Sequence, residues 1–468
     1  MSTSIKNFLK STGVYFLGNI LSKIISFLLL PLYTSHISPD SYGRYDLAAN
    51  YVNLFSTIFF IEIWMGLMRF VIDSESETKK RKVVYSSATI YIVSIILYTG
   101  AFLLFGMWKT VDNMELALLY GVMLTLQNYY GYAARAYGHS TLFAISGVAA
   151  TLTTVLLNLL MILCFKMDTP SLFIASIVGI LVQVVILEVR LKLISGFSFS
   201  YVEKCMIKEL LHYCLPFCLN SVAYWFLSSF NRVMVGEQLS AAQDGIYAVA
   251  VKLSAVINLL GSCFTLSWQE MAYKKSSETD DTGEFYSNAG KLYLNVLCAG
   301  SLVLIPFAGA VFDWFVDERY SQSRTLVPLA LLGAAASLYS VFLGNIFGAA
   351  KKTGFICISM VASCILNVIL MIVLLPVLQA QAATVALFAG FSFNCLLRLL
   401  MLRRLVSMKV NILPLLIYIP LITAVSLVCV KGGFAANAIT TIIAAAIAAY
   451  ALRDFISSFI KSLKGKIA

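Results

Sequence analysis

The chain has 468 residues, of which 60% are hydrophobic and only 12% are charged, with a net charge of +11. Soluble domains are about 45–50% apolar and about 25% charged, so this composition argues against a water-soluble protein of this size. The composition therefore also argues against a soluble enzyme. A basic excess can indicate nucleic-acid binding, but in so apolar a chain it is more typical of membrane topology, and we expect no nucleic-acid partner.

Long apolar runs separated by charged or turn-forming residues predict an all-α polytopic membrane protein, because about 20 apolar residues span a bilayer as a helix. Runs such as Ile356–Leu375 are too long and continuous for the strands of a transmembrane barrel. The predicted helices, fourteen in all, are 12–35, 43–69, 83–107, 115–137, 141–165, 170–190, 210–234, 244–270, 288–312, 325–349, 354–376, 380–402, 412–430 and 434–456.

The distribution of basic residues predicts the orientation of these helices. With the N-terminus in the cytoplasm, 25 of the 34 basic residues fall on inner segments and seven on outer ones, as the positive-inside rule requires. No small-residue cleavage site follows the first apolar run, so we expect a retained first helix. An even number of helices then places both termini in the cytoplasm.

Two pairs of similar segments, called sequence echoes below, predict an internal repeat. The segment Ile37-Ser38-x4-Gly43-x-Tyr45 recurs 202 residues later as Leu239-Ser240-x4-Gly245-x-Tyr247. Likewise, Leu157-Asn158-x2-Met161-Ile162 resembles Leu366-Asn367-x3-Met371-Ile372. Both echoes are six helices apart, and because six is even, they predict two six-helix lobes related by a parallel repeat about the membrane normal.

The repeat and the loops predict four parts of the chain. These are an N-lobe over 1–194, a cytoplasmic linker over 195–209, a C-lobe over 210–404, and two further helices with a basic tail over 405–468. The loops leave no room for an extramembrane domain. The sequence does not indicate what the last two helices do.

The start of the chain carries a distinctive set of residues. They are Gly18, Asn19, Ser22, Lys23, Phe27, Pro31, Leu32, Ile37, Ser38, Pro39, Tyr42, Gly43 and Tyr45. This set resembles the opening of polysaccharide flippases of the Wzx type, in the superfamily that also holds the lipid II flippase MurJ and the MATE exporters. The resemblance implies a V-shaped, two-lobe fold in a bacterial inner membrane and export of an undecaprenyl-pyrophosphate-linked oligosaccharide by alternating access.

Two basic residues are predicted inside the hydrocarbon layer. Lys23 lies near the centre of the first helix, in a stripe with Asn19, and Lys252 lies near the membrane midplane in the eighth. An uncompensated Lys at such a depth costs about 2.5–3.5 kcal/mol, so it needs a water-filled cavity or a partner. One cation from each lobe suits a pyrophosphate headgroup. Alternatively, each Lys pairs with a carboxylate or extends to an interface.

Polar residues at helical spacing predict faces that can line a sugar-binding cavity. Helix two carries Asn50 and Asn53, helix seven carries Asn220 and Tyr224, and helix eight carries Asn258. Such side chains supply the donors and acceptors that a hydroxyl-rich ligand needs. They serve equally well as hydrogen bonds between helices, worth about 0.6 kcal/mol per pair.

Four charged residues are candidates for gating or ion coupling. Glu62 is the one acidic residue predicted inside the hydrocarbon layer, where it can neutralise a Lys, bind a coupling cation or proton, or close the inner mouth. Arg44 and Asp46, at the outer start of helix two, can form an outer gate with Arg232. Interfacial anchoring explains these last three residues equally well.

The sequence favours a flippase over two other classes. A MATE-like, cation-coupled exporter of small molecules would want an acidic cavity, whereas two Lys and one Glu are predicted here. An enzyme is not expected, because no D-x-D motif or phosphate-binding loop occurs and the outer loops are short. The ten cysteines form no C-x-x-C pair, so no metal site is predicted, and no cofactor beyond coupling to membrane potential, H+ or Na+. The sequence does not specify the glycan. The partners expected are the bilayer and a polysaccharide polymerase with its chain-length machinery.

Overall fold

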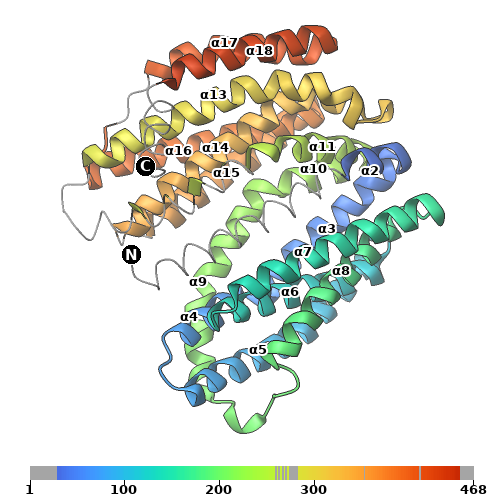
Figure 1. Ribbon diagram of the computed structural model, residues 1–468, viewed down its shortest axis with the longest axis vertical. Coiled ribbons are helices and arrows are strands. Elements are labelled where there is room, and N and C mark those ends of the chain that lie inside the picture. Colours follow the sequence, from blue (N-terminus) through green and yellow to red (C-terminus); the bar gives the residue numbers. More distant parts are fainter. Residues whose placement is uncertain are drawn as a thin grey trace, which may run out of the picture. The chain divides into compact units, whose positions relative to one another are not determined.

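The computed structural model describes residues 29–258, 283–350, 354–409 and 413–453, together with 261, 264–265, 268, 271–272 and 352. All regular structure in these residues is helical (Figure 1). The helices are α2 (Leu30–His36), α3 (Pro39–Phe60), α4 (Ile63–Ile72), α5 (Glu77–Trp108), α6 (Met114–Ala136), α7 (Ser140–Leu159), α8 (Pro170–Leu191), α9 (Lys204–Ser228), α10 (Phe230–Gln238), α11 (Ala241–Ser254), α13 (Gly283–Phe315), α14 (Ser323–Ala349), α15 (Gly354–Leu378), α16 (Ala380–Leu405), α17 (Leu413–Lys431) and α18 (Phe434–Ala451). A π-helical turn, η1 (Leu160–Cys164), extends α7, and short 3₁₀ turns form η2 (Phe199–Tyr201) and η3 (Glu318–Tyr320).

The prediction of an all-α polytopic membrane protein is confirmed. Within the described ranges, nine helices are long and apolar enough to cross a membrane, or ten if α3 and α4 form one bent span. The predicted first helix lies mostly outside the described residues, and so does much of the second half of the eighth. The predicted count of fourteen is therefore approximate. Most predicted ranges correspond to single helices where the chain is described, but the predicted helix 210–234 is divided at Ser229 between α9 and α10.

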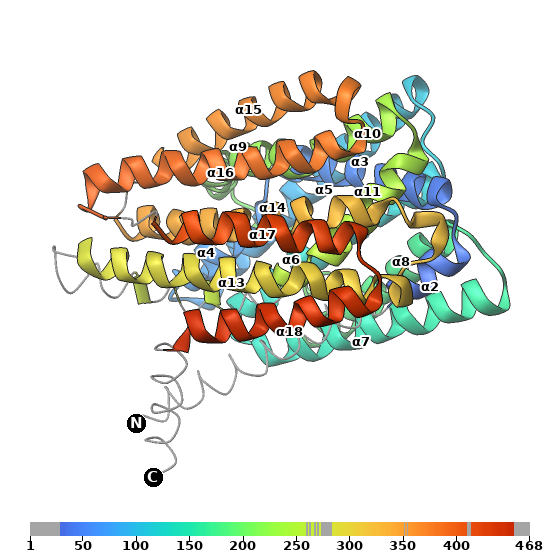
Figure 2. The same cartoon turned by 90° about the horizontal axis from the view of Figure 1, so that it is seen from above.

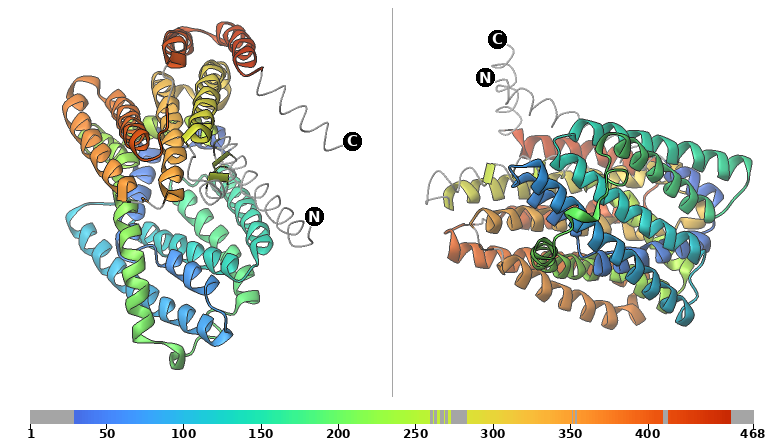
Figure 3. Two further views of the ribbon diagram at one scale, coloured as in Figure 1. Left: turned by 90° about the vertical axis from the view of Figure 1, so that its left-hand side faces the viewer. Right: turned by 90° about the horizontal axis from the view of Figure 1, so that it is seen from below.

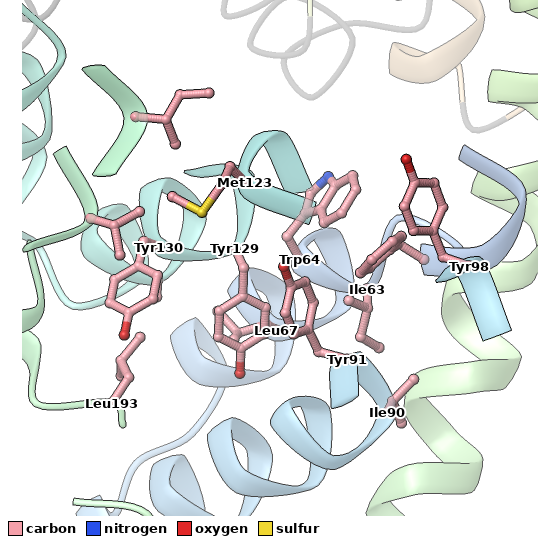
Figure 4. Close-up of a cluster of buried hydrophobic side chains, with 14 of the residues drawn as sticks. Ile63, Trp64, Leu67, Ile90, Tyr91, Tyr98, Met123, Tyr129, Tyr130 and Leu193 are labelled. Atoms are coloured by element: carbon pink, nitrogen blue, oxygen red, sulfur yellow. The ribbon is translucent and has the colours of Figure 1, made fainter. Parts of the chain in front are cut away.

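The chain divides into two compact units, Met1–Trp225 and Phe226–Ala468. In the first unit, α6 packs against α3, α4 and α8, and α7 packs against α8. Its apolar core is rich in tyrosine, and Figure 4 shows Tyr91, Tyr129 and Tyr130 near Trp64 and Leu67. Buried tyrosines need hydrogen-bond partners. Tyr91 has one in Thr125 at 3.1 Å and Tyr129 in Ser87 at 2.9 Å.

The segment that follows α8 is fixed to the first unit by hydrogen bonds. The Glu188 carboxylate accepts backbone N–H bonds from Leu193, Ile194 and Ser195 at 2.8–3.3 Å and a hydroxyl bond from Tyr130 at 2.8 Å. Further along, Lys82 forms an ion pair with Glu203 at 3.1 Å. The predicted linker 195–209 is therefore held to the first unit by these bonds at its start. Its last residues form the first turns of α9, a long helix coloured green in Figure 3.

In the second unit, α14 packs against α11, α13 and α16, while α13 carries the last two helices, α17 and α18, along its length (Figure 2). Arg324 fixes the turn between α17 and α18. Its guanidinium donates to the carbonyls of Cys429 at 2.8 Å, Gly432 at 2.7 Å and Gly309 at 3.0 Å. A cation at the carbonyl end of α17 also interacts favourably with the helix dipole.

The residues of the predicted repeat occupy matching positions in the two units. Ser38 caps the start of α3 by accepting a hydrogen bond from the backbone N–H of Ser41 at 3.1 Å. Ser240 caps α11 in the same way, through the backbone N–H of Gln243 at 3.2 Å. A side-chain oxygen at this position satisfies an N–H group that the helix leaves unpaired.

Candidate functional site

A break in the second membrane span is the most unusual backbone feature of the first unit. The sequence predicts one helix over 43–69, but the structure has α3 and α4 bent by 48° at a two-residue break, which corrects that prediction. Ile61 and Glu62 both adopt left-handed conformations, with φ of 44° and 55°. A β-branched residue in this region is rare, so the surrounding packing must hold it there.

Burial on both sides of the break supplies that constraint. Phe60 and Ile63 are both 0% exposed. Phe60 packs its ring against Tyr91 and Tyr98 at centroid distances of 5.0 and 5.7 Å. Figure 4 shows Ile63 in the same cluster. Close packing of these two side chains supplies the van der Waals contacts that hold the two left-handed residues in place.

The other side of the break faces α9, within the first unit. The Glu62 carboxylate is hydrogen-bonded to the side chains of Ser221 and Trp64. One turn before Ser221, the Cys218 thiol lies 3.4 Å from the carbonyl oxygen of Thr57. The break therefore brings a carboxylate, a hydroxyl and carbonyl oxygens to one helix interface.

The polar face of helix two divides into buried and exposed residues. Asn50 is 5% exposed, and its amide donates to the carbonyl and carboxylate oxygens of Asp46 at 2.7 and 2.9 Å. The backbone carbonyl of Asn50 accepts a hydrogen bond from the indole N–H of Trp225 at 3.2 Å. Asn53 is exposed, so Asn50 acts within the helix packing while Asn53 is accessible.

The predicted residues of helix seven lie on α9. Asn220 is half-buried, and the Tyr224 side chain is 42% exposed. An exposed tyrosine on a membrane helix offers both an apolar ring and a hydroxyl to a ligand or to lipid.

Arg44 lies near the start of α3, with acidic neighbours in the first unit. It forms ion pairs with Asp40 at 2.8 Å and Asp112 at 3.2 Å, and about half of its side chain is exposed. Nearby, the Ser41 hydroxyl donates to the Asp168 carboxylate at 2.6 Å. Exposed ion pairs of this kind contribute about 0–1 kcal/mol, so they can break easily.

The remaining predicted residues belong to the second unit or lie outside the described residues. Arg232 on α10, Lys252 in the last turn of α11, and Asn258 are all half-buried. Lys23 and Asn19 lie outside the described residues. Among the residues that the structure describes, no group of three or more His, Cys, Asp or Glu side chains is placed to hold a metal ion.

The structure reveals a buried charge that the sequence analysis missed. Arg398 on α16 is only 2% exposed. It donates to the Ser359 hydroxyl at 3.0 Å and to the Ser340 carbonyl and hydroxyl at 2.5 and 3.0 Å. Asn394, one turn earlier, donates to the Ser359 carbonyl at 2.9 Å. In the sequence, Arg398 is one of the 25 basic residues on predicted inner segments. The spacing of Asn394 and Arg398, opposite Ser359 and Ser363, is the signal of a polar interior face.

Comparison with solved structures defines the fold. A structure described as lipid II flippase MurJ in an inward closed conformation matches with a TM-score of 0.70 and 14% identity, covering 96% of this chain and 100% of that one. An inward-facing multidrug resistance MATE family transporter of the MOP superfamily matches with a TM-score of 0.65 and 14% identity, covering 82% and 94%. A Vibrio cholerae MATE transporter, VcmN, matches with a TM-score of 0.54 and 14% identity, covering 85% and 97%.

These likenesses, together with the apolar spans, define a multi-pass membrane protein with the fold of this transporter superfamily. Residues 8–267 match the family described as "Polysaccharide biosynthesis protein", which is more than half of the chain, so the chain belongs to that family. The resemblance found in the sequence is thereby confirmed. No curated protein matched the chain significantly.

Proposed function

We propose that this protein is a flippase that moves undecaprenyl-pyrophosphate-linked oligosaccharide repeat units from the cytoplasmic to the outer leaflet for surface polysaccharide synthesis. The observation that carries the proposal is membership of the polysaccharide biosynthesis family, joined to a fold like that of a lipid II flippase over nearly the whole chain. The protein then resides in a bacterial inner membrane with both termini in the cytoplasm, and supplies a polymerase with its chain-length machinery.

The proposed mechanism is alternating access. The diphosphate and glycan enter a cavity in an inward-open state while the polyprenyl tail stays in lipid. Lys23 and Lys252 supply positive charge for the diphosphate, which a low-dielectric region otherwise excludes. The proposed hydrogen-bonding groups for sugar are Asn19, Asn53, Asn220, Tyr224 and Asn258. Asn50 is proposed to hold the polar face of helix two in place through its bonds within the helix packing.

Gating and energy input are assigned to charged groups. Arg44, which forms exposed ion pairs with Asp40 and Asp112, is proposed to act at the outer gate together with Asp46 and Arg232. Glu62 at the broken span is proposed for ion coupling. An anionic headgroup moving outward is also favoured by an inside-negative potential, by about 2.3 kcal/mol per charge per 100 mV.

The proposal is tested in cells that lack the chromosomal copy. We expect them to accumulate the lipid-linked repeat unit and lose surface polysaccharide, and the wild-type chain to restore both. Lys23→Ala and Lys252→Ala should each reduce restoration at equal protein levels. Lys431→Ala, which removes an exposed lysine at the end of α17, is the matched control. Full restoration by both variants would refute the charge assignment.

A second candidate is a cation-coupled exporter of small molecules, which the MATE-like fold favours. It predicts raised efflux of cationic dyes from cells that express the chain. Dye efflux without any effect on surface polysaccharide would favour this function over the flippase.

A further inference from the structure

The broken span between α3 and α4 leaves backbone carbonyl groups without the partners that a continuous helix supplies. Because α3 ends at Phe60, the carbonyls of its last turn have no intrahelical N–H donors. Two of them are directed toward α9, where the Cys218 thiol lies 3.4 Å from the Thr57 oxygen and 4.0 Å from the Ile58 oxygen. A thiol is a weak donor, so these oxygens keep much of their capacity to accept.

Two further oxygen groups lie at the same interface. Glu62 lies two residues after the end of α3, and its carboxylate is hydrogen-bonded to the Ser221 hydroxyl, about one turn beyond Cys218 on α9. The carbonyl end of α3 carries the negative end of the helix dipole. Carboxylate, hydroxyl and carbonyl oxygens beside a negative helix end make a favourable environment for a hard cation.

The charge of these groups selects a monovalent ion. Glu62 supplies one carboxylate to this set through its bond to Ser221, and the described part of the chain holds no group of three or more acidic, His or Cys side chains placed to hold a metal ion. A divalent cation prefers more carboxylates, and a transition metal prefers nitrogen or sulfur. One negative charge with several neutral oxygens balances a single positive charge.

We propose that Glu62, Ser221 and the carbonyl oxygens of Thr57 and Ile58 form a Na+ site at the break in the second span. The inference rests on the proposed function, because it names the coupling ion and its place. A bound ion links the end of α3 to α9 and stabilises the two left-handed residues, Ile61 and Glu62. When the ion is lost, the end of α3 is no longer linked to α9. The strained backbone at Ile61 and Glu62 then favours another arrangement of α3 and α4.

The test is Na+ titration of the purified full-length protein in detergent, without substrate. Choline chloride keeps the ionic strength constant, and intrinsic tryptophan fluorescence and the thermal unfolding midpoint are recorded. Trp64 is hydrogen-bonded to Glu62, so its fluorescence reports on the site, and Trp64→Phe should remove most of the signal. We expect a saturable fluorescence change and a rise in unfolding temperature with Na+ but not with choline.

Two variants and a control make the test specific. Glu62→Gln should weaken the apparent affinity at least about tenfold, because the affinity of oxygen sites follows ligand charge. Ser221→Ala should weaken it by a smaller factor and serves if Glu62→Gln does not fold. Asp73→Asn, at the exposed end of the same helix α4, should leave the affinity unchanged.

Three results would overturn the Na+ site. They are equal responses of the wild-type protein to Na+ and choline, an unchanged Na+ affinity in Glu62→Gln or Ser221→Ala, and a response to pH alone, which would assign a proton to Glu62. Because no lipid-linked substrate is present, failure of the Na+ site leaves the flippase proposal standing. Failure of the flippase proposal in cells likewise does not change the titration.

Discussion

Asn231 and Asn367 exchange hydrogen bonds in both directions in the interior of the second unit. The Asn231 amide donates to the Asn367 side-chain oxygen at 3.2 Å, and the Asn367 amide donates back at 3.0 Å. Both side chains are 0% exposed. Asn231 also donates to the Ala383 carbonyl at 3.0 Å, so the pair joins α10, α15 and α16.

This pairing predicts strong coupling between the two asparagines. Asn367→Ala leaves buried polar groups of Asn231 unpaired and should lower the free energy of unfolding by about 1–3 kcal/mol. Asn231→Ala should cost a similar amount, and the double variant less than the two added together. Thermal or denaturant unfolding of the three variants in detergent measures this. Strictly additive losses would show that the two side chains act independently.

We expect a loss of stability when Arg398 is replaced by lysine, although the positive charge is kept. A lysine ammonium lacks the planar fork that reaches both Ser340 and Ser359, so Arg398→Lys should cost about 1–3 kcal/mol in stability. Arg403→Lys on the same helix changes an exposed side chain and should cost almost nothing. Equal unfolding temperatures for the two variants would contradict the assigned role of the guanidinium.

The contacts of Arg324 predict that it holds the α17–α18 turn. Arg324→Ala removes hydrogen bonds to three carbonyls and should make the region after α16 more sensitive to limited proteolysis, with a stability loss of about 2 kcal/mol. The control is Arg319→Ala, because Arg319 bonds to Asp317 in an exposed turn. Proteolysis that begins at the same protease concentration in both variants would argue against this anchor.

Glu188 predicts local order in the segment that follows α8. Glu188→Gln keeps one acceptor oxygen but loses the charge that strengthens three backbone hydrogen bonds. We expect faster amide exchange at Leu193–Ser195 by at least about tenfold, the change that 1.4 kcal/mol of lost protection produces. Glu203→Gln, which breaks a half-exposed ion pair with Lys82, should not change that exchange.

Helix positions were predictable because apolar length and helix-capping residues are local signals. The predicted helix 170–190 corresponds to α8 (Pro170–Leu191), and 380–402 corresponds to α16 (Ala380–Leu405). Ser38 and Ser240, predicted to be equivalent from the repeat, make the same capping bond. Asn158 and Asn367, from the second echo, are both buried, at 1% and 0% exposure.

The features that were missed depend on tertiary packing. No Gly or Pro marks the break at Ile61–Glu62, which exists because Phe60 and Ile63 are buried on one side and α9 lies on the other. Arg398 looks like a topology signal in sequence, and only the packing of α14, α15 and α16 around it shows that it is interior. Glu62 was identified from its predicted depth, but its hydrogen bond to Ser221 joins helices that are distant in sequence.

The central claim is that this protein moves a lipid-linked oligosaccharide across the bilayer, and reconstitution in proteoliposomes tests it most directly. A fluorescent polyprenyl-diphosphate-linked oligosaccharide is placed in the inner leaflet, and its arrival outside is followed with a membrane-impermeant quencher. The account predicts protein-dependent quenching that the double variant Lys23→Ala, Lys252→Ala abolishes and Lys431→Ala retains. Quenching no faster than in protein-free vesicles, from protein that is folded and correctly inserted, would contradict the account.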